Sequence, residues 1–485
     1  MTVPPFVWRP CLAVLVLLLT GCATFRNYDE EMRQPLSLAS EGNVDAAIGV
    51  LNRHNRAKKK DMLYYMELGE LRRLGEQYVA SNSAWASADR GVREWESAAK
   101  LDPARTAGAL MSYAVNDKVR PYEGHDYEKV MLTTRIALNY LAEGDWDNAR
   151  VAIKQTHERE AVIAQVHEKQ TQQLEQQARK SGARTSVREL NGYPVETIDN
   201  PAVNALRNSY QSAFSHYLAG FVYEALGEPS LAAAGYRQAI ELQPGLPLLE
   251  DALAGLDTRV AARDEGTTDL LIAVETGLVP ARVSQQFPLP IPVNDRLILI
   301  PVSFPILQDT EPGRPPDSVR IDGIETHAVP ITSVDAMVRR ALQDEMPAIM
   351  LRSFVRSTGK AVAQYQTQRQ ADINRRRGNG GAAAALDIAT IALMLGSVVT
   401  ESADERGWRS LPATISIARV KLPPGAHRIS LSTWRGDAST EIELRGRYAF
   451  VGLRLLGDAL YSFGRRPHAP LPAEAKRMHA MNERN

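Results

Sequence analysis

A stretch of about 34 residues that starts at Ala213 constrains the fold of this chain more than any other part of its sequence. Small and large side chains recur in it at the spacing of two helices that cross closely. Gly227 separates the two helical patterns, as a glycine that tolerates positive φ does at a helix end. The pattern therefore predicts a helical hairpin. Its positions are Ala219, Gly220, Tyr223, Gly227, Ala232, Tyr236, Ala239 and Pro244.

Three weaker copies of this pattern precede it. In two of them a glycine, Gly42 or Gly144, ends one helix, and Asp or Asn residues then start the next. The matching residues are Tyr65, Leu68, Gly69, Trp85 and Ala88 after Met62; Ile136, Ala137, Tyr140, Gly144, Ala149 and Ile153 after Val130; and Gly42, Asn43, Asp45, Ala46 and Leu51 nearest the start of the chain.

Four copies in matching register resemble the tetratricopeptide repeat (TPR). The resemblance implies an all-α TPR-like array over residues 30–260, in which the first helix of each repeat lines a concave groove for a protein partner. Aromatic side chains and a carboxylate there suit a peptide or helix with apolar anchors and a basic residue. An alternative is that residues 157–212 of the chain itself cover Phe214 and Phe221. The family's groove positions correspond to Glu70, Arg73, Thr134, Leu138, Phe214, Tyr217, Phe221 and Glu224.

The repeats are not tandem, because 104–129 and 157–212 interrupt them. Residues 157–185 are rich in Gln, Glu and Lys with sparse apolar positions, which predicts a long solvated helical arm. A loop is expected from Gly192 to Pro201.

The sequence pattern of residues 265–462 predicts an α+β domain with an antiparallel sheet. The whole chain is therefore expected to be an α+β multidomain protein. Short apolar runs interrupted by proline predict strands. Asp322-Gly323 is a hairpin-turn signal, and Ser333–Arg377 reads as helix with a start or kink at Pro347. Residues 463–485 are expected to form a disordered tail. The predicted strands are Thr268–Leu278, Arg296–Phe304, a pair within Ser318–Ile331, Ala413–Lys421, His427–Trp434, Thr440–Leu444 and Tyr448–Leu456.

The N-terminus predicts export and lipid attachment. Residues 11–19 form an apolar run of signal-peptide length, too short to cross a bilayer. The run ends in Leu19-Thr20-Gly21-Cys22, which resembles the bacterial lipobox. The resemblance implies a signal peptide over 1–21, diacylglycerol and acyl chains such as palmitate on Cys22, and a tether over 22–29. Ala23, where Asp would imply retention at the inner membrane, implies the periplasmic face of the outer membrane.

Composition narrows the remaining possibilities. The chain has two cysteines, and loss of Cys11 with the signal peptide would leave Cys22 without a disulfide partner. Burial must then hold the fold together, which 485 residues with 44% hydrophobic content allow. The formal net charge is zero, which gives no reason to expect nucleic acid as a partner.

Three short motifs resemble a family of TPR-containing outer-membrane lipoproteins of Gram-negative bacteria. They are Tyr122–Glu128, Trp408–Pro412 and Leu422–His427. The resemblance implies a location and an architecture, and no settled activity. Turn and packing chemistry explains the three motifs better than a binding role does.

Signals for catalysis are weak. Ser357-Thr358-Gly359-Lys360 has the S-x-x-K spacing of penicillin-binding proteins, but Ser97–Lys100 has it too, and neither S-D-N nor K-T-G occurs. The run Arg375–Gly381 lacks the G-K-[ST] ending of a P-loop. His157 and His167 have no metal-ligand spacing. The sequence therefore predicts neither an enzyme nor a cofactor or metal.

The apolar run within 382–400 favours a core helix, with membrane contact or oligomer formation as the alternative. The function expected is that of a membrane-anchored periplasmic scaffold or adaptor in cell-envelope biogenesis: cell-wall synthase regulation, outer-membrane assembly or secretion. The alternative is a structural subunit of a membrane-associated oligomer that uses the 382–400 helix. A hydrolytic enzyme is a distant third.

Overall fold

The computed structural model describes residues 27–57, 60–110, 121–182, 185–262, 266–293, 296–308, 315–377, 402–433 and 436–464. The expected signal peptide, Cys22, the apolar run 382–400 and nearly all of the expected tail lie outside these residues. Within the described ranges, no helix is both long enough and apolar enough to cross a membrane.

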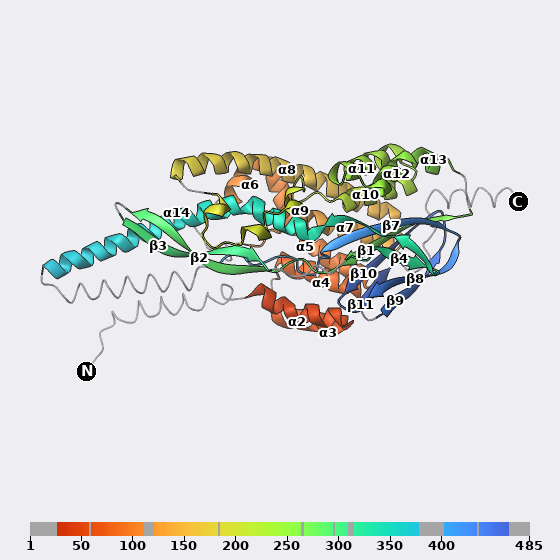
Figure 1. Ribbon diagram of the computed structural model, residues 1–485, viewed down its shortest axis with the longest axis horizontal. Helices are drawn as coiled ribbons and strands as arrows, with labels where there is room; N and C mark the ends of the chain where they lie inside the picture. Colours follow the sequence, from red (N-terminus) through yellow and green to blue (C-terminus); the bar gives the residue numbers. More distant parts are fainter. Residues whose placement is uncertain are drawn as a thin grey trace.

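Eight helices of the first half pack as four consecutive hairpins, at the places where the sequence pattern predicts them (Figure 1). Polar side chains begin several of these helices by accepting backbone N–H groups, as Asp61 and Ser212 do from Tyr64 and Ser215. The hairpins are α2 (Tyr28–Ser40) with α3 (Val44–His54), α4 (Met62–Leu74) with α5 (Tyr78–Leu101), α7 (Asp126–Ala142) with α8 (Trp146–Ser181), and α10 (Ala213–Ala225) with α11 (Pro229–Leu242).

Glycines let the helices of two hairpins approach closely. A Cβ on Gly69 would lie 2.2 Å from the Trp85 ring, and one on Gly220 would lie 2.5 Å from the Tyr236 ring. Both distances are far below van der Waals contact, so an aromatic ring fills the space that a side chain would need. The small-against-aromatic pairing predicted for the repeats is confirmed at these two crossings.

The segments between hairpins are short helices and turns. The predicted solvated arm is part of α8, and Val162, Ile163 and Val166 in it are buried, so its first half is a packed helix. The expected loop at 192–201 contains a 3₁₀ turn. These elements are α6 (Pro103–Leu110), η3 (Val187–Glu189), η4 (Val195–Thr197), α9 (Pro201–Asn204), α12 (Pro247–Ala254) and α13 (Leu256–Ala261).

The described part of the second half contains three sheets. A five-stranded sheet has the order β11-β10-β1-β7-β6, a four-stranded sheet has the order β5-β4-β8-β9, and β2 pairs with β3 alone. The strands are β1 (Thr268–Thr276), β2 (Arg282–Val293), β3 (Arg296–Leu307), β4 (Ser318–Ile321), β5 (Ile324–His327), β6 (Val329–Ser333), β7 (Thr414–Leu422), β8 (Gly425–Thr433), β9 (Gly436–Leu444), β10 (Tyr448–Leu456) and β11 (Ala459–Phe463).

The prediction of a purely antiparallel sheet is wrong at one pair, because β1 and β10 run parallel. The chain leaves β7 for the four-stranded sheet, forms β8 and β9 there, and returns to the five-stranded sheet on the other side of β1. This return places β10 beside β1 in the same direction. β1 is consequently a central strand, and all nine of its residues are buried.

A long arm projects from the body (Figure 1). It consists of the β2–β3 hairpin and of the second half of α14 (Val334–Arg376), a 43-residue helix that continues through Pro347 and whose first half is buried in the body. One face of the hairpin packs against the rest of the molecule, because Phe287, Ile300 and Val302 on that face are at most 5% exposed.

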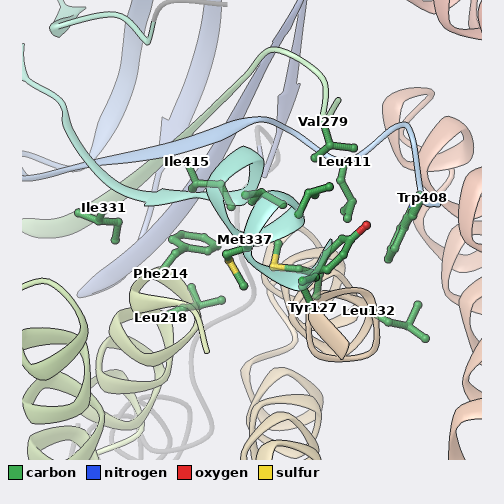
Figure 2. Packing of buried hydrophobic residues seen from close by; sticks show 14 of the residues in the cluster. Tyr127, Leu132, Phe214, Leu218, Val279, Ile331, Met337, Trp408, Leu411 and Ile415 are labelled. Atoms are coloured by element: carbon green, nitrogen blue, oxygen red, sulfur yellow. The ribbon is translucent and has the colours of Figure 1, made fainter. Parts of the chain in front are cut away.

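One hydrophobic cluster joins the two halves of the chain. It runs from Leu63 in α4 through Phe214 in α10 to Phe450 in β10. Figure 2 shows Phe214 and Leu218 of the helical array beside Met337 of α14 and Ile331 of β6. The helical array and the α+β part therefore share this core, although each also has a smaller cluster of its own, such as the one from Leu270 to Leu453 between the sheets.

Candidate functional site

The eight predicted groove residues are all buried. Their exposed fractions are 0% for Glu70, Arg73, Leu138, Phe214, Tyr217 and Phe221, 1% for Thr134 and 2% for Glu224. The expectation that they form an accessible protein-binding groove is corrected by this burial: no partner can reach these side chains while the fold is intact.

The chain's own sheet fills the groove. The ring of Phe221 lies 5.7 Å from the ring of Tyr448 in β10, and the Arg419 guanidinium of β7 lies 5.0 Å from the Phe221 ring. The backbone N–H of Phe214 donates to Thr332 in β6, at 2.9 Å. Strands of the α+β part therefore cover the aromatic positions, in place of the cover by residues 157–212 that the sequence offered as an alternative.

Glu224 illustrates how the sheet uses the groove. This carboxylate accepts hydrogen bonds from Arg419 at 2.8 Å and from Tyr448 at 3.2 Å, both in the sheet. It also accepts one from Tyr236 in its own repeat, at 2.6 Å, and from Arg259 in α13. Burial raises the pKa of Glu224, but the arginines and hydrogen bonds outweigh burial and lower it. A carboxylate expected to bind a partner's cation instead binds two arginines of the same chain.

A buried ion cluster lies at the other end of the groove. Arg135 of α7 donates to Glu275 of β1 and, at 3.1 Å, to Glu70 of α4. Arg73 of α4 donates to Glu275 at 3.2 Å. Arg454 of β10 is the lateral neighbour of Glu275 in the sheet. All five side chains belong to residues that are 0% exposed.

Opposing effects act on the charges of this cluster. Burial raises the pKa of Glu275, but Arg135, Arg73 and Arg454 outweigh it and lower the pKa to about 2. Burial lowers the pKa of Arg454 to about 10 despite the nearby glutamates. Glu275 and Arg454 therefore remain ionised at neutral pH. By formal charge, the cluster holds three arginines against two glutamates.

Two further carboxylates hold the Trp408–Pro412 motif. Glu128 of α7 accepts the backbone N–H of Trp408 at 2.6 Å, and Glu67 of α4 accepts those of Arg409 at 2.7 Å and Ser410 at 3.2 Å. Glu128 also accepts the hydroxyls of Tyr122 and Tyr127. The motifs at 122–128 and 408–412 thus bind each other, which is the turn and packing role favoured by the sequence.

A small pocket adjoins this junction. Its polar lining includes His125, Arg282, Arg406 and Arg409, with Val279 and Val338 as apolar walls. Glu345 of α14 accepts from Arg282 at 2.6 Å and contacts His125 at 2.7 Å. Arg406 and Arg409 bond to Asp404 and Asp29, so each arginine of the lining has a carboxylate partner.

Four other residues singled out from the sequence have structural contacts or are buried, and Arg375–Gly381 lies partly outside the described residues. Ser357 is fully buried and Ser97 donates to the Arg93 carbonyl at 2.8 Å. His157 stacks on His216, with ring centroids 4.9 Å apart, and His167 contacts Asp126. Among the residues that the structure describes, no three His, Cys, Asp or Glu side chains are grouped to hold a metal ion.

The outer face of the β2–β3 hairpin is a surface that the sequence analysis missed. Leu299 is 68% exposed, and Pro288 and Pro301, which are opposite each other across the hairpin, are also exposed. Gln286 is exposed on the same face. These side chains carry no charge.

Proline also protects the edges of this hairpin. In an antiparallel pair, residues on one face have N–H groups that point either all toward the partner strand or all outward. Pro288 lies opposite Pro301, and proline has no N–H to donate to the partner strand, so this face is the one whose backbone N–H groups point outward. The prolines on it therefore remove hydrogen-bond donors from the two edges of the hairpin. Strand addition to either edge is thereby disfavoured, and the face itself is what remains for contact.

Comparison with known proteins adds little. No model of a known protein family matches the chain, and no curated protein matches it. Among solved structures, a tetratricopeptide repeat protein from Parabacteroides merdae ATCC 43184 is similar at 12% identity, over 47% of this chain and 98% of that one, with a TM-score of 0.13. A TM-score this low carries no argument about fold or function.

Proposed function

We propose that this protein is a lipid-anchored scaffold or adaptor of the cell envelope, in which Cys22 carries the lipid. The helical array holds the α+β part of the same chain, and the β2–β3 arm makes the contact with a protein partner. Periplasmic location at the outer membrane and a role in envelope biogenesis follow from the lipobox and motif resemblances alone, and they are part of the proposal. We also propose that the protein is not an enzyme.

The observation that carries the proposal is the contrast between the filled groove and the exposed outer face of the hairpin. Leu299 is 68% exposed although it lies one residue from Ile300, which is 5% exposed. An uncharged, apolar face on a projecting element suits a partner surface with apolar side chains. The prolines there are already restricted in φ, so less conformational entropy is lost on binding.

Crosslinking in intact cells tests this proposal. A photoreactive residue replaces Leu299 in one variant and Leu231 in a control. Leu231 is a matched position, because it is an exposed leucine (44%) on α11. We expect a discrete adduct from position 299 and none from position 231. Adducts from both positions, or from neither, would refute the arm as the binding surface.

The same experiment examines the alternative of a membrane-associated oligomer. An adduct between two copies of the chain would favour that alternative, in which the 382–400 segment and the arm join subunits. Sedimentation of the Cys22→Ser chain provides the independent measurement, since a monomer at micromolar concentration would count against it.

A further inference from the structure

The cluster of Glu70, Arg73, Arg135, Glu275 and Arg454 carries one more positive than negative charge. Because every member is 0% exposed, water cannot screen the surplus from outside. An uncompensated charge in a protein interior is strongly destabilising, and arginine does not relieve it by losing its proton. Something not supplied by these five side chains must balance the cluster.

The hydrogen bonds indicate which arginines lack an acceptor. The three guanidinium groups have nine nitrogen atoms, and five of these have no hydrogen-bond partner among the residues that the structure describes: Nε and Nη2 of Arg73, Nε of Arg135, and Nε and Nη1 of Arg454. Buried donors in native proteins are almost always satisfied, by protein groups or by enclosed water and ions. So many unsatisfied donors in one cluster point to an acceptor between them.

Within the described ranges, Arg454 is the arginine of the cluster to which no carboxylate bonds. Arg73 and Arg135 both bond to Glu275, and the Phe463 ring covers the Arg73 guanidinium at 3.7 Å. Arg454 donates to the backbone carbonyl of Ser410, at 3.4 Å, and its other two nitrogens are unsatisfied. A water molecule could accept from these nitrogens, and it could bridge to the unsatisfied Oε2 of Glu70, but it would leave the charge unbalanced.

We propose that a small monovalent anion of the size of chloride binds beside Arg454, where the helical array meets the sheet. The complete burial of the cluster favours a monatomic ion over phosphate or a carboxylate ligand. Since the site combines α4, α7, β1 and β10, a bound anion would stabilise the packing that fills the groove. The inference does not depend on the proposed scaffold function.

The direct test is diffraction from crystals of the full chain grown or soaked in bromide. We expect an anomalous peak within hydrogen-bond distance of the Arg454 guanidinium. Density at that place without an anomalous signal would identify water and would overturn the proposal, as would continuous packing with no density.

Thermal unfolding gives a second, independent readout. The Tm of the wild-type chain should rise by a few degrees as chloride replaces gluconate at constant ionic strength. The Arg454→Met variant should lose this dependence, because its cluster is neutral, whereas Arg428→Met should retain it. Arg428 is an exposed arginine paired with Glu441 on the four-stranded sheet. Equal chloride dependence in all three proteins would overturn the proposal, and the bromide experiment decides the matter if Arg454→Met does not fold.

Discussion

The concave face of the helical array and the outer face of the β2–β3 hairpin invert the usual expectation for a repeat protein. The positions that a TPR normally offers to a partner, such as Tyr217 and Phe221, are 0% exposed, while Leu299 of the hairpin is 68% exposed. The repeat helices here bury a sheet of their own chain, as a core does. A repeat pattern thus specifies how helices pack, and what fills the concave face depends on the rest of the chain.

The strongest test of this comparison is removal of Glu275, the carboxylate that the sheet inserts between Arg73 and Arg135. We expect Glu275→Gln to lower the free energy of unfolding by about 3–5 kcal/mol, because it leaves buried arginines without a counter-charge. Chemical denaturation of the purified chain measures this. Glu441→Gln is the matched control, since it breaks an exposed pair with Arg428 and should cost less than about 1 kcal/mol. A similar small loss for both variants would mean that the sheet is not held in the groove by this cluster.

The second test concerns Glu67, whose pKa is raised to about 7 because burial outweighs its hydrogen bonds. Between the ordinary pKa of a glutamate and about pH 7, the Glu67 carboxyl is therefore protonated in the folded state and ionised in the unfolded state. The contribution of Glu67 to stability therefore falls as pH rises through this window, and it is most favourable at the acid end.

Glu67→Gln should remove that contribution. The difference in unfolding free energy between wild type and variant should change by on the order of 3 kcal/mol between pH 4.5 and 7.5. Denaturation series at several pH values provide the measurement. A difference between Glu67→Gln and wild type that stays constant over this range would contradict the raised pKa of Glu67.

The third test uses two helical glycines in opposite surroundings. Gly220→Ala places a Cβ 2.5 Å from the Tyr236 ring and should destabilise the protein by about 1–3 kcal/mol through overpacking. A Cβ on Gly359, in α14 of the arm, would meet no atom of the described residues within 4 Å, so Gly359→Ala should stabilise the protein by about 0.5–1 kcal/mol. Opposite signs of the two changes in Tm are expected. A stabilising Gly220→Ala would show that the repeat crossing is looser than described.

Local features could be predicted from the sequence because neighbouring residues determine them. Helices α4 and α10 begin at Met62 and Ala213, as the repeat register predicts, and Asp322-Gly323 forms the turn between β4 and β5. Strand β2 was not among the predicted strands, and it contains three prolines. They are tolerated there because a two-stranded ribbon leaves outward N–H positions free.

The content of the groove could not be predicted, because it depends on contacts between residues far apart in the chain. Glu275 meets Arg135 across 140 residues, and Phe214 meets Thr332 across 118. The hydrophobic periodicity of a helix indicates that one face is apolar, but it does not indicate which element covers that face. The same limit applied to the sheet, where the parallel pairing of β1 with β10 follows from an excursion of the intervening chain.

The smallest effect on stability is expected at Leu299, and it bears most directly on function. Leu299→Ser should change the free energy of unfolding by no more than about 0.5 kcal/mol, because the side chain is mostly exposed. Its neighbour Ile300, buried on the inner face, should cost about 2–5 kcal/mol when changed to Ala. If the outer face binds a partner, Leu299→Ser should abolish co-purification of that partner from crosslinked cells while folding is unchanged. If Leu299→Ser retains the partner and Leu231→Ser loses it, the binding surface lies on the outer side of the repeats and not on the arm.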